Sequence, residues 1–317
     1  MQNKKPIIII AVLSVLALGL GYWVGLPKDG SDERVEVVAP PAPTVVTNVV
    51  TNTLKEVVTN IVTTTPQPTP TPAPVKPQPT PTPPPVGTFI NTLGMKFVPV
   101  AGTDVQFCIW ETRVKDYAEY AAANAGVDAS WKSPGFTQAD THPVVKVNWE
   151  DANAFCAWLT KKELAAGKIK AGQKYRLPTD AEWSVAVGLG NEKGNTPEEK
   201  DSGIRDVYPW GKEWPPPKGA GNYDGSLNVD KFDRTAPVGS FSANQFGLHD
   251  MGGNVWEWCE DWYDPTAQKY RVLRGASWSD LGTYPDYLLS SSRYYGTPDS
   301  RDGIVGFRCV LVGGSGG

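Results

Sequence analysis

The chain has 317 residues, with 34 acidic and 30 basic side chains and a formal net charge of −4. This balance leaves no basic footprint, so we expect no nucleic acid partner. The two histidines, His142 and His249, are too few for the imidazole-rich sites of mononuclear iron enzymes or for the usual catalytic zinc sites.

An apolar run of about 21 residues, 6–26, follows Lys4 and Lys5 and is long enough to cross a bilayer as a helix. The basic residues before it place the amino terminus in the cytoplasm. We therefore predict a cytoplasmic tip and transmembrane anchor over residues 1–30, with the following domain periplasmic or extracellular. A cleaved signal peptide is the competing interpretation, although no small-x-small cleavage site follows the apolar core.

Residues 31–87 have almost no aromatic side chains, so we predict a disordered stalk there. In its first half, Val50, Leu54, Val57 and Ile61 have the spacing of a coiled-coil seam, which leaves a short oligomerising helix open beside an extended spacer. Its second half, 66–85, is rich in Thr and Pro. That composition favours polyproline II at about 3.1 Å per residue, or about 60 Å of reach.

Residues 88–317 contain eleven of the twelve tryptophans and are long enough for one domain with a substantial core. Helices are predicted at 114–123, which is rich in Ala, at 148–159, where Asn148 can cap and acids fill the first turn, and at 179–183, where Thr-x-x-Glu makes a capping box. The second helix should pack on a sheet. Most of the remainder is typical of short strands and long turns, which indicates an irregular α+β domain.

The segment 246–258, Phe-Gly-Leu-His-Asp-Met-Gly-Gly-Asn-Val-Trp-Glu-Trp, is the most informative stretch of the chain. Three glycines and an asparagine around Asp250 allow tight turns that aim backbone carbonyls at one point, as a hard cation such as calcium requires. The indoles of Trp256 and Trp258 would anchor that loop. The alternative interpretation is that Asp250 and Glu257 are simple loop-capping acids.

The domain resembles the formylglycine-generating enzyme, or sulfatase-modifying factor, family over essentially all of residues 88–312. Besides the segment 246–258, the resemblance is carried in order by Asn-Thr-Leu-Gly-Met-Lys-Phe-Val-Pro-Val at 91–100, His-Pro-Val-Val at 142–145, Val-Asn-Trp at 147–149, Tyr-Arg-Leu-Pro-Thr-Asp-Ala-Glu-Trp at 175–183, Tyr-Pro-Trp-Gly at 208–211, Arg-Gly-Ala-Ser-Trp at 274–278 and Gly-Phe-Arg-Cys at 306–309. The resemblance implies a fold related to the C-type lectin module, with little regular secondary structure and calcium held by loops.

Two structural calcium sites are implied by the resemblance. The first would use Asn222, the carbonyl of Tyr223, Asp230 and the carbonyl of Phe232. The loop between Asn222 and Asp230 is shorter than the family pattern.

The second site would use Asp250, the carbonyls of Gly253 and Val255, and Glu257. Asp250 stands where the family commonly has an amide, and the extra negative charge should strengthen a hard-cation site.

The activity of the family uses two cysteines, five residues apart, that bind copper(I), since soft thiolates select this ion. Counted between Arg274 and Cys309, those positions hold Asp280 and Pro285. No other cysteine lies between Cys259 and Cys309. We therefore expect no copper and no family oxidase activity.

The four cysteines suit a disulfide-permissive compartment. The resemblance pairs Cys156 with Cys309, a bridge that would fix the last strand to the helix at 148–159. Cys108 and Cys259 could form a second bridge or stay as buried thiols, and the sequence leaves both open.

The carboxyl-terminal segment lines the substrate cleft in the related fold, and here residues 279–300 mix Tyr, Ser, Asp and Gly as antibody paratopes do. We predict that Tyr284, Tyr287, Tyr294 and Tyr295 contact a protein or peptide ligand. Packing of these tyrosines in an aromatic core is the alternative. A diversified segment like that of retroelement-driven variable proteins, which share the fold, also remains open.

The sequence therefore favours a membrane-anchored, extracytoplasmic, calcium-stabilised domain without the family's oxidase activity, which recognises its ligand through a Tyr-rich cleft. Arg293 and Arg308 are interpreted as structural donors to ion pairs or carbonyls. An oxygen-dependent oxidoreductase of the wider copper or nonheme-iron family is the alternative, although His142 and His249 match no iron-binding histidine pattern. An accessory protein that binds an extended peptide is a third possibility.

Overall fold

The computed structural model describes residues 87–313. The predicted anchor and nearly all of the predicted stalk lie outside these residues. Within the described part of the chain, no helix is both long and apolar enough to cross a membrane.

Five short strands form the first sheet, which is antiparallel throughout, in the order β1-β2-β3-β9-β4. They are β1 (Phe89–Ile90), β2 (Lys96–Pro99), β3 (Val105–Cys108), β9 (Val310–Val312) and β4 (Lys174–Arg176). The last strand of the chain thus lies between β3 and β4. The carboxyl end of the domain is therefore fixed at the middle of the sheet.

The second sheet has the order β7-β6-β5-β8 and consists of β7 (Tyr294–Gly296), β6 (Arg271–Arg274), β5 (Trp256–Trp262) and β8 (Val305–Gly306). Its β5 and β8 strands run parallel, whereas its other pairs are antiparallel. Strand β5 begins at Trp256, inside the informative segment 246–258. The register pairs Glu257 with Arg274 of β6 and with Gly306 of β8. The second sheet therefore joins three of the sequence stretches that carried the family resemblance.

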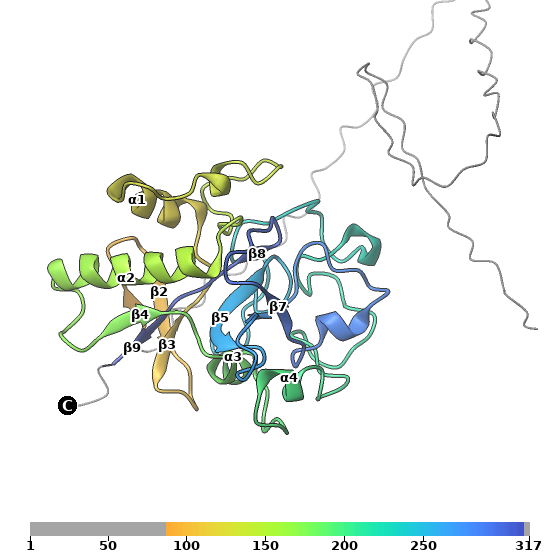
Figure 1. The fold of residues 1–317 in the computed structure, drawn as a ribbon. Coiled ribbons are helices and arrows are strands. Elements are labelled where there is room, and N and C mark those ends of the chain that lie inside the picture. Colours follow the sequence, from red (N-terminus) through yellow and green to blue (C-terminus); the bar gives the residue numbers. More distant parts are fainter. Residues whose placement is uncertain (1–86, 314–317) are drawn as a thin grey trace, which may run out of the picture. The chain divides into compact units, whose positions relative to one another are not determined.

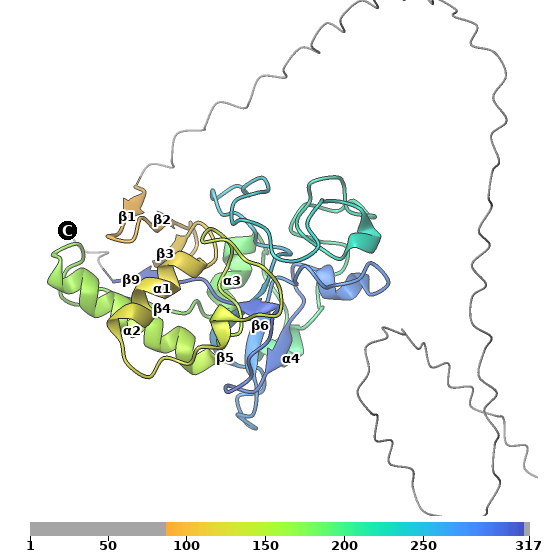
Figure 2. The same ribbon diagram turned by 90° about the horizontal axis from the view of Figure 1, so that it is seen from above.

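The three predicted helices are confirmed as α1 (Val114–Ala123), α2 (Trp149–Ala165) and α3 (Asp180–Val187). The described residues also contain a short α4 (Pro197–Lys200) and the 3-10 turns Ser130–Lys132, Gly225–Leu227 and Pro285–Leu288. Long loops connect the elements, and the expected α+β class is confirmed (Figures 1 and 2).

Helix α2 begins where its sequence predicts. The Asn148 side chain accepts a hydrogen bond from the Asp151 amide and the Asp151 carboxylate accepts one from the Asn148 amide, which completes a capping box. Ala152, Phe155 and Leu159 are buried on the face that contacts the first sheet at β4. Figure 1 shows α2 lying along this sheet, with α1 beyond it.

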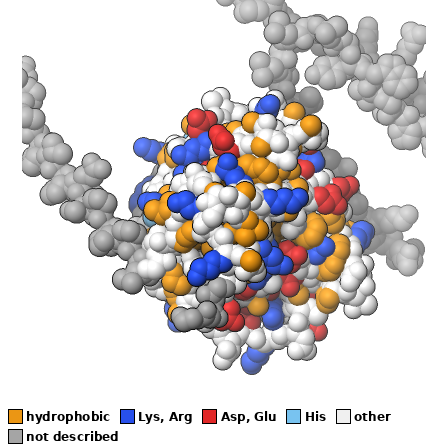
Figure 3. Space-filling model, turned by 90° about the vertical axis from the view of Figure 1, so that its left-hand side faces the viewer, with side chains coloured by type: hydrophobic (Ala, Val, Ile, Leu, Met, Phe, Trp, Pro, Cys, Tyr) orange, Lys and Arg blue, Asp and Glu red, His pale blue; other side chains and the backbone are white. Residues whose placement is uncertain are grey.

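Both sheets contribute to a continuous apolar interior. Phe155 of α2 contacts the rings of Tyr117 and Phe307, which brings α1, α2 and the carboxyl-terminal segment together. On the face turned toward the viewer in Figure 3, Lys and Arg side chains are dispersed among uncharged and hydrophobic ones.

A buried ionic network connects α3 to the carboxyl-terminal half of the domain. The Asp180 carboxylate accepts from Arg274 Nη1 at 2.5 Å and from Arg293 Nη2 at 3.0 Å, and Arg293 Nη1 also pairs with Glu192 at 2.6 Å. The Ser184 hydroxyl accepts from both guanidinium groups. Burial by itself raises the pKa of Asp180, but the attraction of Arg274 and Arg293 outweighs it and lowers this pKa below its ordinary value.

We predict that Asp180→Asn lowers the free energy of unfolding by about 3 to 5 kcal/mol at pH 7, because it leaves Arg274 without a buried counter-ion. The lowered pKa of Asp180 means that its contribution is complete above the unfolded-state value near 3.9 and is lost as the pH falls through the folded value. Denaturant unfolding at several pH values should therefore show a constant difference from the unsubstituted chain down to about pH 4 and a smaller one below it.

Asp286→Asn provides the matched control, because its pair with Arg205 is exposed on both side chains. It should change the free energy of unfolding little. Equal destabilisation by the two substitutions would contradict the large contribution to stability that we predict for the buried network.

Candidate functional site

In the loop 222–232, Asp230 binds the backbone at Tyr223 and Phe232, two other members of the first predicted calcium set. The Asp230 carboxylate accepts hydrogen bonds from the amides of Tyr223 at 3.0 Å and Phe232 at 2.8 Å. Asn222 is fully buried, and its Nδ2 donates to the carbonyl of Arg234 at 2.8 Å. Its Oδ1 is buried without a hydrogen-bond partner among the described residues. An unpartnered buried carbonyl oxygen and a carboxylate in one loop are the types of donor that a hard cation accepts.

The second predicted set lies at the start of β5, where its acids already have protein partners. The Asp250 carboxylate accepts from the Gly239 amide at 2.6 Å. The Glu257 carboxylate accepts from Arg308 at 2.7 and 2.6 Å and from Trp183 Nε1 at 3.0 Å. The structural roles expected of Arg308 and Arg293 are both confirmed. Arg308 and Trp183 were missed as partners of this acid.

The two loops are in direct backbone contact. Gly253 has a φ of +79°, and a Cβ there would lie 2.4 Å from the carbonyl oxygen of Asn222. Only glycine permits this approach. The next residue, Asn254, donates its amide to that same carbonyl at 2.8 Å, and its side-chain oxygen accepts from Asn222 Nδ2 at 3.1 Å. The two predicted sets therefore form one continuous region.

Glu111 completes this region and was not predicted from the sequence. Its Oε1 accepts from Asn254 Nδ2 at 3.0 Å, whereas its Oε2 is buried without a partner among the described residues. Burial, followed by the negative charge of Asp250, raises the pKa of Glu111 well above its ordinary value. Burial also raises the pKa of Asp250. The only sequence signal was an acid directly after the apolar segment 107–110.

Arg308 is the cation that balances these buried acids. Burial lowers its pKa, but the Glu257 carboxylate outweighs that effect and keeps the guanidinium charged. Glu111, Asp250 and Glu257 thus interact with one guanidinium, so ionisation of all three acids would leave an excess negative charge that a bound cation would relieve. Within residues 87–313, no three His, Cys, Asp or Glu side chains converge as a metal cluster. A calcium site here would depend on carbonyl oxygens as well.

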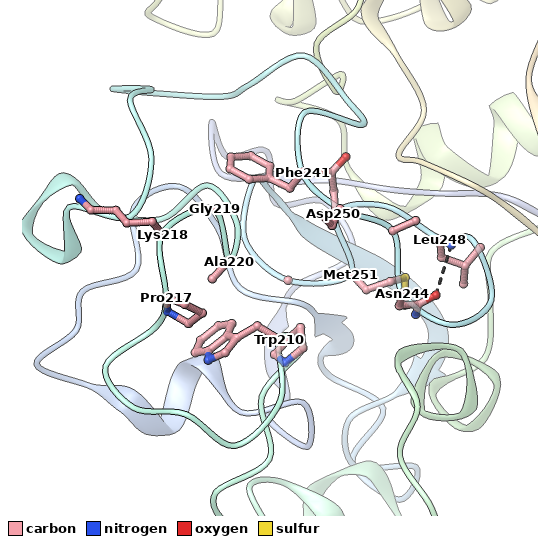
Figure 4. A pocket seen from close by; sticks show the side chains of 14 residues that line it. Trp210, Pro217, Lys218, Gly219, Ala220, Phe241, Asn244, Leu248, Asp250 and Met251 are labelled. Atoms are coloured by element: carbon pink, nitrogen blue, oxygen red, sulfur yellow. Dashed lines mark hydrogen bonds between the residues drawn. The ribbon is translucent and has the colours of Figure 1, made fainter. Parts of the chain in front are cut away.

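Two adjoining cavities border the predicted metal loops. The first, of about 290 Å³, is lined on one side by Trp210 and Pro217 and on the other by Phe241, Asp250 and Met251 (Figure 4). The second, of about 570 Å³, is lined by Asp230 and Phe232 and shares its Phe241 wall with the first. Each predicted calcium set therefore has one acid at a cavity.

The four predicted ligand-contacting tyrosines lie at the surface rather than in the core. Their exposed fractions are 59% for Tyr284, 45% for Tyr287, 44% for Tyr294 and 42% for Tyr295. Consecutive rings lie 5.9, 6.4 and 5.6 Å apart, between centroids, in that order. We call this series of exposed rings the tyrosine row. The alternative in which these residues fill the core is wrong.

None of the four tyrosines lines either of the two cavities described above. The row rests instead on other aromatic rings: Tyr294 contacts Trp256 at 5.5 Å, and Tyr295 contacts Tyr263 at 4.6 Å and Tyr270 at 4.9 Å. Arg293 of the ionic network directly precedes Tyr294. The row is thus presented on a rigid support.

The two positions that correspond to the family's copper cysteines have structural roles. The Asp280 carboxylate accepts from the Ser277 amide at 2.8 Å and from its hydroxyl at 2.6 Å, which closes a tight turn. Burial raises the pKa of Asp280. Pro285 begins the 3-10 turn that carries Tyr287. Neither side chain offers a soft ligand for copper(I).

The predicted Cys156–Cys309 bridge is not formed in this structure, although the two side chains are neighbours. Cys156 and Cys309 lie with their Sγ atoms 3.5 Å apart, but as free thiols, since a disulfide requires about 2.05 Å. The Thr112 hydroxyl also contacts Cys309 Sγ, at 3.7 Å. Cys108 and Cys259 are buried free thiols as well, so the second bridge is not formed. Burial raises the pKa of both, which makes them poor nucleophiles and poor ligands.

Known proteins are similar in sequence to more than half of this chain. The chain is 36% identical over 198 residues to the inactive C-alpha-formylglycine-generating enzyme 2 of Mus musculus, covering 59% of this chain and 56% of that protein. It is 33% identical over 212 residues to the formylglycine-generating enzyme of Thermomonospora curvata and 36% identical over 213 residues to that of Streptomyces coelicolor. These matches cover 57% of this chain and 61% and 58% of those proteins. The chain thus spans less than two thirds of the length of these relatives.

Among solved structures, PvdO from Pseudomonas aeruginosa matches with a TM-score of 0.46 and 25% identity, over 66% of this chain and 80% of that chain. The Treponema denticola variable protein 1 matches with a TM-score of 0.43 and 21% identity, over 70% and 93%. The sequence profile of the sulfatase-modifying factor enzyme 1-like domain matches residues 67–312, which is most of the chain. The chain therefore belongs to the formylglycine-generating, sulfatase-modifying factor family.

Proposed function

We propose that this protein is a membrane-anchored, extracytoplasmic binding domain that recognises a protein or peptide through the tyrosine row and does not carry out the family's oxidation. The observation that carries the proposal is the row itself: four rings in mutual contact, each more than two fifths exposed. Tyrosine offers a broad, rigid contact area and a polar tip, so such a surface favours binding. Its hydroxyls form no hydrogen bond within residues 87–313 and are available to a ligand.

The proposed absence of oxidase activity is supported by the chemistry of the substituted positions. Asp280 and Pro285 replace the two thiols that the family uses, and the four cysteines of the chain are buried elsewhere in the domain. Copper is therefore not an expected cofactor. Oxidation of a substrate cysteine remains the alternative function, because relatives named as formylglycine-generating enzymes are about as similar to this chain as the one named inactive.

The proposed location rests on the sequence. The apolar run 6–26 would hold the chain in a membrane with its amino terminus in the cytoplasm, and the stalk over 31–87 would separate the domain from the bilayer. The domain would then be periplasmic or extracellular, with a fold related to the C-type lectin module. An exposed aromatic row on such a stalk is suited to partners outside the cytoplasm.

Calcium is the proposed structural cofactor. The first set, Asn222 and Asp230 with the carbonyls of Tyr223 and Phe232, is supported by the unpartnered Asn222 Oδ1. The second set, Asp250 and Glu257 with the carbonyls of Gly253 and Val255, is supported by the excess of buried acids over Arg308. Bound calcium would join the two loops and would supply no chemistry to a substrate.

The first prediction concerns ligand recognition. A displayed peptide library and a glycan array screened with the full chain in detergent should yield peptide ligands, and Tyr287→Ala/Tyr294→Ala should weaken them by about tenfold or more, as loss of central aromatic contacts does. Ile90→Ser, which removes an exposed apolar side chain from β1 of the other sheet, should leave binding unchanged. Peptide hits favour an accessory role, and glycan hits favour a lectin-like one. Ligands whose binding is unaffected by the tyrosine substitutions would refute the assignment of this surface.

The second prediction concerns oxidation. The full chain incubated with copper(I), oxygen and a peptide that carries the Cys-x-Pro-x-Arg motif should leave the peptide thiol unchanged by mass spectrometry, because residues 279–300 contain no thiolate. Asp280→Cys/Pro285→Cys is the informative variant, since it restores both sulfurs. An aldehyde product formed by the unsubstituted chain after removal of free copper would refute the non-catalytic proposal.

The third prediction concerns calcium. Saturating calcium should raise the melting temperature by about 5 to 10 °C relative to the chelator-treated protein, since a ligand at 100 times its Kd adds about 2.7 kcal/mol. Asp230→Asn should remove much of this increase. Asp224→Asn is the matched control, because Asp224 lies in the same loop and caps the Ser226 amide, a role that Asn also fills. A calcium response of equal size in both variants would exclude Asp230 as a ligand.

A further inference from the structure

The tyrosine row offers aromatic surface that positively charged side chains can bind. The face of a tyrosine ring is electrically negative, so it attracts a lysine ammonium or an arginine guanidinium. Each of the four tyrosines is more than two fifths exposed, so a ligand can reach the rings. A row of this kind suits either an apolar or a cationic ligand, and the charges around it decide between the two.

A lysine of the domain already lies over a ring at one end of the row. Lys269 Nζ is 4.9 Å from the ring centroid of Tyr270, and the rings of Tyr270 and Tyr295 are themselves 4.9 Å apart between centroids. Lys269 is exposed, so burial does not force this contact. The aromatic surface that continues the row therefore accepts an ammonium group.

Acidic side chains lie close to Tyr294, near the middle of the aromatic surface. Burial contributes most to the raised pKa of Tyr294, and the negative charges of Asp280 and Asp302 raise it further. Asp302 is exposed, and its Oδ1 accepts a hydrogen bond from the Ile304 amide at 3.2 Å. It forms no ion pair within residues 87–313. Its charge is thus available to attract a cation to Tyr294.

Acids also lie beside Tyr263, on which the ring of Tyr295 packs. The Tyr263 hydroxyl donates to the Asp201 carboxylate at 3.2 Å, and the Tyr263 carbonyl accepts from the Glu198 amide at 3.2 Å. Burial, followed by the charge of Asp201, raises the pKa of Tyr263, and the charge of Glu198 adds to this effect. Glu198 is exposed. The row therefore has an unscreened acid near each of its two β7 tyrosines.

The nearby basic residues do not balance these acids. The two segments that flank the row, 196–206 and 279–302, contain eight acidic and four basic residues. Three of the four basic residues are arginines that already have partners: Arg205 with Asp286, Arg293 with Asp180 and Glu192, and Arg301 with Asp151. An excess of negative charge around exposed rings favours a positively charged ligand over an apolar one.

The spacing of the rings matches an extended peptide. Consecutive rings of the row are 5.9, 6.4 and 5.6 Å apart. In an extended chain, alternate side chains point to the same side and lie about 6.6 Å apart. Basic residues at alternate positions can therefore place one cation on each successive ring. The row is at most about 18 Å long, which corresponds to about five or six extended residues.

We propose that the tyrosine row binds an extended segment of a partner protein that carries Arg or Lys at alternate positions. This inference rests on the proposed function, because it names the class of peptide that the same surface takes. The ring faces would hold the cations in direct contact. Asp302 and Glu198 would attract the segment from a longer range and would favour it over neutral or acidic peptides.

The test measures the binding of fluorescent peptides to the full chain in a nonionic detergent. The probe alternates Arg and Ser, and two comparison peptides of the same length have Gln or Glu in place of every Arg. At about 0.05 M NaCl the Arg peptide should bind about tenfold or more tightly than the Gln peptide, and the Glu peptide should not bind. At about 0.5 M NaCl the Arg peptide should bind more weakly, because salt screens exposed charges.

Substitution of the rings tests the cation contacts. Tyr287→Ala/Tyr294→Ala should weaken binding of the Arg peptide by about tenfold. Tyr287→Phe/Tyr294→Phe should keep most of the affinity, since a phenylalanine ring also attracts a cation. Recognition through the tyrosine hydroxyls would instead be lost in the Phe variant as fully as in the Ala variant, and that result would overturn the proposal.

Substitution of the acids tests the charge complementarity. Glu198→Gln/Asp302→Asn should weaken binding of the Arg peptide by about two- to fivefold at low salt and by less at high salt. Glu119→Gln/Asp104→Asn is the matched control, because it removes two exposed acids from α1 and from the turn before β3. It changes the net charge equally and should leave the affinity nearly unchanged. An equal loss in the two variants would contradict a local role of the acids.

The proposal is overturned if the Arg peptide binds no better than the Gln peptide, or if its binding is unaffected by Tyr287→Ala/Tyr294→Ala. These failures are distinct from failure of the proposed function. If the peptide library yields tyrosine-dependent ligands that are neutral or acidic, the row recognises another class of peptide and only this inference is wrong. If neither the library nor the Arg peptide shows tyrosine-dependent binding, both proposals are wrong.

Discussion

The Asp180 carboxylate, held between Arg274 and Arg293, is the interaction on which the carboxyl-terminal half of the domain depends. Neither guanidinium has exposed side-chain surface, so burial of either charge without its carboxylate partner would be strongly unfavourable. The two arginines also donate to the carbonyls of Ser290, Ser291 and Ser292. A segment without regular secondary structure is thereby fixed to α3 and β6. Arg293 and then the exposed Tyr294 follow this segment directly.

A second buried pair, Arg308 and Glu257, fixes the loops that carry the predicted calcium ligands. Arg308 binds Glu257 with two hydrogen bonds and also donates to the carbonyls of His249 and Asp250. Asn254 then connects that loop to Asn222 and Glu111. In a fold with short strands, these side chains supply the order that longer hydrogen-bond ladders would otherwise give. Loop geometry here is determined by buried polar groups.

The helices could be predicted from the sequence because their signals are local. Asn148 and Thr179 cap helices whose acids stand three residues later, and both capping boxes are formed. The buried pairs could not be predicted in this way. Asp180 and Arg293 are separated by 113 positions, and only the folded chain brings them together. Glu111 was missed for the same reason, because a single acid after an apolar strand forms no sequence pattern from which its partner could be predicted.

Composition located the candidate binding surface, but not its shape. A segment rich in Tyr and Ser indicated contact residues, and the four tyrosines proved to be exposed. Their arrangement as a row outside the cavities depends on the 3-10 turn that carries Tyr287 and on the pairing of β7 with β6, and neither has a strong sequence signal. The cysteine pairing came from the family resemblance, and the observed contact between two thiols agrees with it in position alone.

Asp280 and Pro285 connect the proposed absence of copper chemistry with the proposed binding surface. A thiolate pair must remain accessible and free to bind metal, whereas Asp280 uses its carboxylate to close a turn on Ser277, and Pro285 fixes the start of the next turn. Both replacements restrict the backbone that carries Tyr284 and Tyr287. A rigid backbone lowers the entropy lost on binding, which benefits recognition and offers nothing to copper coordination. The backbone of this segment therefore suits the proposed recognition role better than copper coordination.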